Sequence, residues 1–310
     1  MMSIVICLSF MVVALASGAQ ARTLEVGETK PFKMPSAAAS AAQDGDRIAI
    51  YPGEYFDCAV WKANNLVVEG VASPEQVVVT DKSCQGKALF ITAGNGITIR
   101  NLTLTRARVP DDNGAGIRAE GRNLVVERVR FINNQNGIMS GTAGGSMIIR
   151  NSVFEGNGAC LSSCAHGVYV DALDLLRIEG SQFIGTKRGH HIKSRALRTE
   201  VIGCTIKDGP EGTASYAIEI PNGGSVVIRG NTIEKGPKAE NHSGAIVIGA
   251  EGVTRPTPEI TIEDNTFRND GDWDTAFVNN LTATEAILRG NKLSGQVQPL
   301  RGDGRVTAGH

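Results

Sequence analysis

The chain has few aromatic residues and no excess of charge of either sign. Only 15 of its 310 residues are Phe, Trp or Tyr, against 37 glycines. This composition argues against a single globular core built around large rings and is typical of a fold with many tight turns and small side chains. Because 31 basic residues are balanced by 32 acidic ones, the net charge gives no basis for binding nucleic acid or an anionic membrane.

The sequence also lacks an apolar run long enough to cross a bilayer. The N-terminal apolar stretch, residues 4–15, is too short for a spanning helix and is followed at residues 19–21 by Ala-Gln-Ala, the small-x-small pattern that signal peptidase cleaves. We therefore expect residues 1–21 to be a signal peptide, which predicts a periplasmic or secreted protein with no membrane contact after cleavage. Since no Lys or Arg precedes the apolar stretch, an uncleaved anchor stays open as the alternative.

What the chain does contain is one six-residue phrase in eight copies. The phrase reads Ile-Arg-Asn-Ser-Val-Phe at residues 149–154, and its copies begin at residues 99, 126, 149, 178, 201, 228, 262 and 288. The intervals vary from 23 to 34 residues while the phrase is kept. Equal structural units joined by loops of unequal length explain this pattern.

Each unit is predicted to form about three short strands separated by turns, because no helical period occurs between residues 88 and 293. At two places of the phrase, the equivalent residues of successive units are expected to stack on one another and form a column. The sixth place is always apolar, and the fourth ends in Asn231, Asn265 and Asn291, whose side chains can form a hydrogen-bonded ladder. Strands that cannot bury both faces alone do so by stacking on the next unit, so the sequence predicts an all-β parallel solenoid.

These columns resemble those of the right-handed parallel β-helix proteins of the pectate-lyase-like superfold. The resemblance covers residues 44–293, and the Asp-Gly-Asp and Pro-Gly-Glu-Tyr segments within residues 44–55 are similar to the opening of secreted bacterial β-helices. It implies a single-stranded right-handed parallel β-helix over residues 46–295. Residues 22–45 are then an N-terminal cap with a short helix, since an uncapped stack exposes apolar surface and strand edges. Residues 296–310 are expected to be a C-terminal tail or cap.

Five cysteines would remain in an oxidising compartment after signal cleavage. Cys58 and Cys84 lie one unit apart, and Cys160 and Cys164 flank a short loop, so these are the candidate disulfides. Cys204 occupies the fourth place of its phrase. A buried structural thiol is expected there rather than a reactive one.

The second strand of each unit carries the candidate site, because the resemblance implies a ligand groove along the sheet of these strands. We align the strands on their inward apolar residue, from Ile117 to Phe277. Outward positions at both ends of this sheet hold mostly Gly, Ala or other apolar residues, and the polar residues gather in the middle. The candidates are Tyr169, His191, Lys193 and Glu219, with Asp171 and Arg195 one step further along, His166, His190 and Tyr216 near the strand starts, and Arg118 two units earlier. With rungs ~4.8 Å apart, this cluster has the reach of one or two sugar residues.

The chemistry that suits this set is β-elimination on, or C5 epimerisation of, a uronate-containing polysaccharide. Both reactions remove a weakly acidic proton next to a carboxylate, which needs a base and a cation that stabilises the enolate-like charge. We expect Arg195 to hold the carboxylate and Lys193 to take the proton, since the positive neighbours His191 and Arg195 favour its neutral form. Tyr169 or His191 would protonate the leaving oxygen. Glu219 opposes the role of Lys193, because a carboxylate favours the charged amine.

Two other classes stay open. A non-catalytic glycan-binding or structural protein would use the same groove without turnover, and an exposed Lys193–Glu219 pair is also an ordinary cross-strand contact. A glycoside hydrolase needs two carboxyl groups at a defined separation, and Asp171 and Glu219 lie two rungs apart, which places this class third.

No cofactor is required by these residues, and an acidic polysaccharide is the expected partner of a monomeric chain. Calcium is an open alternative without support, since a cationic rung follows the rung that holds Asp171 and the superfold's calcium sites gather acidic side chains on adjacent rungs. Zinc is disfavoured because His190 and His191 are neighbours on a strand and point to opposite faces.

Overall fold

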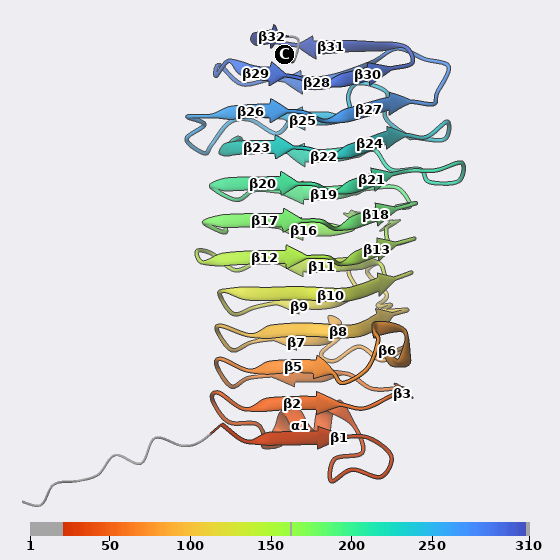
Figure 1. Ribbon diagram of the computed structural model, residues 1–310, viewed down its shortest axis with the longest axis vertical. Coiled ribbons are helices and arrows are strands. Elements are labelled where there is room, and N and C mark those ends of the chain that lie inside the picture. Colours follow the sequence, from red (N-terminus) through yellow and green to blue (C-terminus); the bar gives the residue numbers. More distant parts are fainter. Residues whose placement is uncertain (1–20, 162, 308–310) are drawn as a thin grey trace, which may run out of the picture.

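The computed structural model describes residues 21–161 and 163–307, and the chain in it winds as a parallel β-solenoid (Figure 1). The expected signal peptide lies outside these residues, except for Ala21. Two helical segments occur in the described part, α1 (Pro35–Ala41) and the single-turn η1 (Pro74–Gln76). Neither has the length and apolarity needed to span a bilayer. The all-β solenoid with a short N-terminal helix is thus confirmed.

One large sheet holds two neighbouring columns of strands. The first column contains β1 (Thr23–Val26), β2 (Arg47–Ile50), β5 (Val67–Gly70), β8 (Thr98–Thr105), β10 (Leu124–Ile132), β12 (Ser146–Arg150), β17 (Leu175–Glu179), β20 (Arg198–Ile202), β23 (Ser225–Arg229), β26 (Ile260–Glu263), β29 (Ala286–Arg289) and β32 (Gly304–Thr307). The second contains β3 (Gly53–Tyr55), β6 (Val77–Thr80), β13 (Val153–Glu155), β18 (Gln182–Ile184), β21 (Thr205–Lys207), β24 (Thr232–Lys235), β27 (Thr266–Asn269) and β30 (Lys292–Ser294). Strands β8 and β10 run through both columns.

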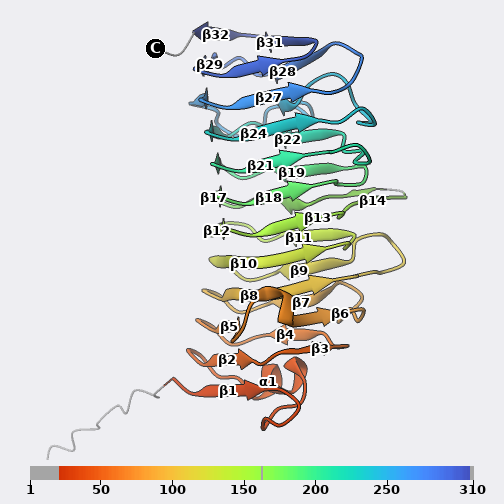
Figure 2. The same ribbon diagram turned by 45° about the vertical axis from the view of Figure 1, so that its right-hand side comes forward.

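A second, ten-stranded sheet forms the opposite wall of the coil (Figures 1 and 2). Its strands are β4 (Ala59–Trp61), β7 (Ala88–Thr92), β9 (Ala115–Ala119), β11 (Asn136–Ser140), β16 (Val168–Val170), β19 (His190–Ser194), β22 (Tyr216–Ile220), β25 (Ile246–Ile248), β28 (Thr275–Asn280) and β31 (Val297–Arg301). A small antiparallel hairpin, β14 (Ala159–Cys160) with β15 (Cys164–Ala165), projects from the loop before β16.

The repeated phrase forms the corner between the two columns of the large sheet. Its third residue has a left-handed φ of 48° to 67° in all eight copies, at Asn101, Arg128, Asn151, Gly180, Gly203, Gly230, Asp264 and Gly290. Gly, Asn and Asp tolerate this conformation far better than other residues do. The phrase therefore recurs because every coil must turn at the same place.

Both columns of the phrase stack as expected. In the sixth place, the Phe131, Phe154 and Phe183 rings are buried and parallel, with centroids 4.6 and 4.5 Å apart. In the fourth place, Asn231 Nδ2 donates to Asn265 Oδ1 at 2.8 Å, and Asn265 Nδ2 donates to Asn291 Oδ1 at 2.9 Å. The apolar stack and the amide ladder hold successive coils in register.

The ends of the coil differ from each other. At the N-terminal end, α1 lies beside β1, with Ala38 buried in the core (Figure 1). At the C-terminal end, β31 pairs with β28 and β32 pairs with β29, so the coil continues past residue 295, where a tail or cap was expected. One expected alignment is wrong nearby: Ile246 pairs with Val278 rather than Phe277, which turns Val278 inward and Asn279 outward.

Candidate functional site

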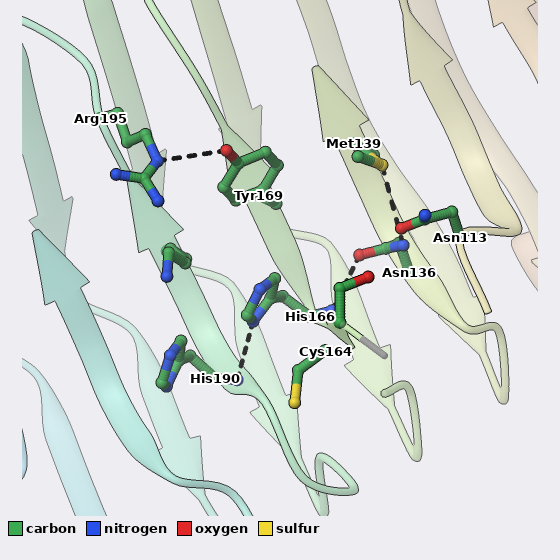
Figure 3. Close-up of a pocket in the computed structure, with 10 residues that line it drawn as sticks. Asn113, Asn136, Met139, Cys164, His166, Tyr169, His190 and Arg195 are labelled. Atoms are coloured by element: carbon green, nitrogen blue, oxygen red, sulfur yellow. Dashed lines mark hydrogen bonds between the residues drawn. The ribbon is translucent and has the colours of Figure 1, made fainter. Parts of the chain in front are cut away.

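An open hollow of about 470 Å³ lies over the middle of the ten-stranded sheet (Figure 3). Strands β11, β16 and β19 form its floor, and the hairpin β14–β15 supplies part of its wall. The lining residues are Asn113, Asn136, Met139, Ser163, Cys164, His166, Tyr169, His190, Lys193 and Arg195. Hydrogen-bond donors and cations predominate, and no carboxylate is among these residues. Such a lining suits an anionic or hydroxyl-rich ligand.

Three of the candidates lie side by side as the strand alignment predicted. Tyr169 pairs with Lys193, and Lys193 pairs with Glu219, on the neighbouring strands β16, β19 and β22. Lys193 Nζ lies 2.9 Å from Glu219 Oε2 and 2.6 Å from Glu251 Oε1. Two carboxylates that do not line the hollow therefore form ion pairs with this ammonium group.

Glu219 is a buried carboxylate with cationic and imidazole neighbours. Its Oε2 lies 3.0 Å from His190 Nε2 as well as close to Lys193. These are ion-pair distances, and no described residue meets hydrogen-bond geometry at this oxygen. Burial by itself raises the pKa of Glu219, but His190 and Lys193 outweigh it and lower the pKa to about 2. The carboxylate is consequently ionised at all ordinary working pH values.

Arg195 is fixed by three partners at the rim of the hollow. Its Nε donates to the Tyr169 hydroxyl at 3.1 Å (Figure 3), its Nη1 contacts Asn222 Oδ1, and its Nη2 donates to Glu251 Oε2 at 2.6 Å. Burial lowers the pKa of Arg195, but the Glu251 carboxylate and Tyr169 outweigh this and raise it. These contacts orient the guanidinium group. Because the Tyr169 oxygen accepts from Arg195, the hydroxyl proton of Tyr169 is not used in this bond and can be donated to another group.

A second ladder, made of imidazole rings, runs along the strand starts. His166 and His190 stack with centroids 4.9 Å apart, and His190 and Tyr216 stack at 5.1 Å. Each side chain accepts from the next backbone amide: His166 N donates to Asn136 Oδ1 at 2.8 Å, His190 N to His166 Nδ1 at 3.0 Å (Figure 3), and Tyr216 N to His190 Nδ1 at 3.1 Å. Burial lowers the pKa of both histidines, which keeps the rings neutral.

His191 does not face the groove, so the expectation that it would is wrong. Its side chain is fully buried inside the coil, where Nδ1 lies 2.7 Å from Thr186 Oγ1 and Nε2 lies 2.8 Å from Asp208 Oδ1. Strict alternation fails at this place in other rungs as well, since a Cβ at Gly137 or Gly167 would also point inward, toward Phe154 or Phe183. His190 and Lys193 then face the hollow, while His191 and Ile192 point inward.

Three other candidates lie around the hollow without lining it. Tyr216 covers His190, and its hydroxyl is held by Asn241 at 2.7 Å and Ser243 at 3.2 Å. Arg118 reaches Met139 Sδ at 2.7 Å. Asp171 follows β16 and is half-buried.

Several site residues were not predicted from the sequence. Glu251 and Asn222 orient Lys193 and Arg195, and Asn113 and Asn136 line the hollow. The one available signal was length: Glu251 lies in the loop after β25, within the 34-residue interval between residues 228 and 262, which is the longest of the series. This loop folds back so that the Glu251 amide donates to Pro221 O at 3.0 Å.

The cysteines form two disulfides, Cys58–Cys84 and Cys160–Cys164. The second one closes the hairpin that walls the hollow. Cys204 is buried, and burial raises its pKa to about 11, which makes it an unreactive thiol.

The residues around the hollow do not suit a metal ion. Over residues 21–161 and 163–307, no group of three or more His, Cys, Asp or Glu side chains is arranged to hold one. The nearby carboxylates, Glu219 and Glu251, are already paired with Lys193 and Arg195. A calcium ion would have to compete with those cations for its oxygen ligands.

Known proteins share this architecture. The family model for the right handed beta helix region matches residues 160–304, whereas no curated protein sequence matches the chain. The crystal structure of pectate lyase Pel9A superposes with a TM-score of 0.68 at 15% identity, covering 94% of this chain and 80% of that one. The crystal structure of alginate lyase from Paenibacillus sp. str. FPU-7 gives 0.58 at 17% identity, covering 91% and 99%. The chain therefore has a right-handed parallel β-helix fold, which it shares with pectate lyase Pel9A.

Proposed function

We propose that this protein acts on a uronate-containing polysaccharide by removing the proton next to the sugar carboxylate, as a lyase or a C5-epimerase. The observation that carries the proposal is the convergence of Tyr169, Lys193 and Arg195 on one open hollow lined by donors and cations. Two solved structures of similar fold are named as lyases of alginate and pectate, both acidic polysaccharides, which supports this substrate class.

Arg195, Lys193 and Tyr169 have different roles in the proposed reaction. Arg195 binds the sugar carboxylate and stabilises the negative charge that develops on it. Lys193, as the neutral amine, removes the C5 proton. In elimination the C4–O bond then breaks, a C4=C5 double bond forms, and the Tyr169 hydroxyl gives its proton to the leaving oxygen. In epimerisation Tyr169 would return a proton to the opposite face of C5.

The two carboxylates beside Lys193 set the condition under which it works. Glu219 Oε2 lies 2.9 Å and Glu251 Oε1 lies 2.6 Å from its Nζ. Binding of an anionic sugar to Arg195 would compete with Glu251 for the same guanidinium. Loss of that ion pair would also loosen the hold of Glu251 on Lys193.

The same ion pairs favour a second candidate, a non-catalytic glycan-binding protein. A lysine paired with two carboxylates can donate hydrogen bonds to sugar hydroxyl groups without removing a proton. In that case the hollow would bind a uronate oligomer without turnover.

An extracytoplasmic location fits either activity. Two disulfides within one chain are typical of an oxidising compartment. We propose that the protein works in the periplasm or outside the cell, where such polysaccharides occur.

Incubation of the mature chain with a panel of uronate polymers tests the proposal. Elimination produces unsaturated sugar ends with a characteristic ultraviolet absorbance, and epimerisation changes the C5 proton signals in NMR spectra. Lys193→Ala and Arg195→Ala should abolish either signal, while Lys238→Ala, which breaks an exposed ion pair with Glu211, should not. Reducing ends without unsaturation would indicate a hydrolase, and binding without any product would indicate the second candidate.

A further inference from the structure

We propose that His166 is a substrate-positioning residue that acts as a neutral Nε2–H donor, and that the backbone amide of His190 fixes this tautomer. The inference rests on the proposed function for the identity of the ligand, a uronate. It goes beyond that function by assigning a residue, a ring nitrogen and a protonation state. None of the roles given above to Lys193, Tyr169 and Arg195 depends on it.

The tautomer follows from the direction of one hydrogen bond. A backbone N–H is always a donor, so the His166 Nδ1 that lies 3.0 Å from His190 N must accept and cannot carry a proton. A neutral imidazole has one N–H, which therefore belongs to Nε2. Doubly protonated His166 would set two donors against each other, at a position that is only 6% exposed.

The same hydrogen-bond arrangement repeats one rung further along. His190 Nδ1 accepts from Tyr216 N at 3.1 Å, and its Nε2 lies 3.0 Å from the Glu219 carboxylate. The single N–H of His190 thus faces the Glu219 carboxylate. His166 has no such carboxylate, and no described residue bonds its Nε2.

His166 faces the hollow, so its Nε2–H is available to a ligand there. Lys193 and Arg195 line the same hollow, and Figure 3 shows Arg195 beside Tyr169 there. A neutral donor adds a directed hydrogen bond to a carboxylate or hydroxyl oxygen without offering a proton that could quench the base. The ring is also held on both sides, by His190 at 4.9 Å and Tyr169 at 5.6 Å between centroids, which gives the fixed orientation that positioning requires.

The chain itself suggests the variant that isolates this role. One rung earlier the ladder uses Asn136, whose Oδ1 accepts the amide of His166. His166→Asn should therefore keep an acceptor for the His190 amide while removing the Nε2–H. His166→Ala removes both and serves as the comparison.

The first experiment reads the tautomer directly, without any substrate. Long-range proton–nitrogen NMR correlations of the histidine-labelled full chain, recorded at neutral pH and assigned with the Asn variants of His166 and His190, should show both rings as neutral Nε2–H tautomers. Observation of His166 with Nδ1–H, or as an imidazolium, would overturn the inference. Addition of short galacturonate and mannuronate oligomers should move the Nε2 signal of His166.

The second experiment separates positioning from chemistry and from folding. His166→Asn should unfold at the wild-type temperature but raise KM about tenfold or more, the effect of losing a hydrogen bond to a charged group, with kcat little changed. Wild-type KM in this variant, or a loss confined to kcat, would overturn the positioning role. If the tautomer is as expected but no uronate binds or reacts, the donor assignment stands and the proposed substrate class fails.

Discussion

Lys193 Nζ lies 2.9 Å from the Oε2 of Glu219, a carboxylate that is only 4% exposed. This contact fixes the lysine in the hollow. The pair is thus a main reason for the geometry of the site.

Glu219→Gln should lower the rate of elimination or epimerisation, because Glu219 fixes the position of Lys193. The pKa of Glu219 is about 2, so its negative charge is present throughout the working range, and its Oε2 lies 2.9 Å from Lys193 Nζ. We expect kcat/KM to fall about tenfold or more, the effect of a displaced reacting group. Glu251→Gln, at a more exposed carboxylate, should give a smaller loss. Unchanged kcat/KM in both variants would show that neither carboxylate positions Lys193 for the reaction.

Asn265→Ala should destabilise the coil by about 1 to 3 kcal/mol. The substitution removes the Oδ1 that accepts from the Asn231 amide at 2.9 Å and the Nδ2 that donates to Ile228 O at 3.0 Å. Chemical denaturation measures the change. Asn265→Ser is the matched control, because Ser181 occupies the same place of its own phrase and still accepts an amide, so this variant should lose less.

The free energy of unfolding should increase as the pH rises from 8 to 10.5, because of the buried Lys235. Burial lowers the pKa of this lysine from 10.5 to about 8, against the opposing effect of Asp208. Between these values the unfolded chain binds more protons than the folded one, so the free energy of unfolding increases with pH. The gain relative to Lys235→Met should reach roughly 3 kcal/mol.

Denaturation of both proteins at the two ends of this pH range checks the prediction, because the titration of all other groups cancels in the difference. The Nζ of Lys235 also donates to Ser215 O at 2.7 Å, a bond that contributes a constant offset. A difference that is independent of pH would show that the buried lysine titrates normally.

Gly137→Ala should destabilise the ten-stranded sheet by about 1 to 3 kcal/mol or prevent folding. A Cβ at this position would lie 2.4 Å from the Gly167 carbonyl oxygen and 2.6 Å from Cδ1 of Phe154, inside the stacked phenylalanine column. Gly141→Ala is the control, since no atom lies within 4 Å of its Cβ position, and should change stability by less than about 0.5 kcal/mol. Thermal unfolding of the two variants measures this difference, and equal unfolding temperatures would contradict the prediction.

The prediction of the fold from the sequence succeeded because its signal is repeated. Each copy of the phrase must turn the same corner, so left-handed positions such as Asn151 and Gly180 recur at one place. The apolar sixth place and the amide fourth place recur for the same reason. The alignment of the second strands was correct from Ile117 to Ile246. It was wrong by one residue at β28, because Ala276-Phe277 resembles the small-apolar pair that begins the other strands, whereas Ile246 pairs with Val278.

The site was only partly predictable, because it depends on exceptions to the repeat. Tyr169, Lys193 and Glu219 could be placed in register, since parallel pairing carries over from strand to strand. The orientations of His190 and His191 could not, because the residue before the inward apolar one also points inward, as at Gly137 and Gly167, which breaks the alternation expected of a strand. Glu251 could not be placed either, because a loop of irregular length carries no period.

The sequence by itself determined the solenoid, its coil repeat and the segment of the sheet where polar side chains gather, since local turns and stacking columns act within and between adjacent units. Only the tertiary structure decided which side chains meet in the hollow. Loops returning from distant residues bring Glu251 onto Lys193 and Arg195, and burial against Phe183 and Asp208 turns His191 inward. Those contacts come from packing in three dimensions, which a pattern along the chain does not record.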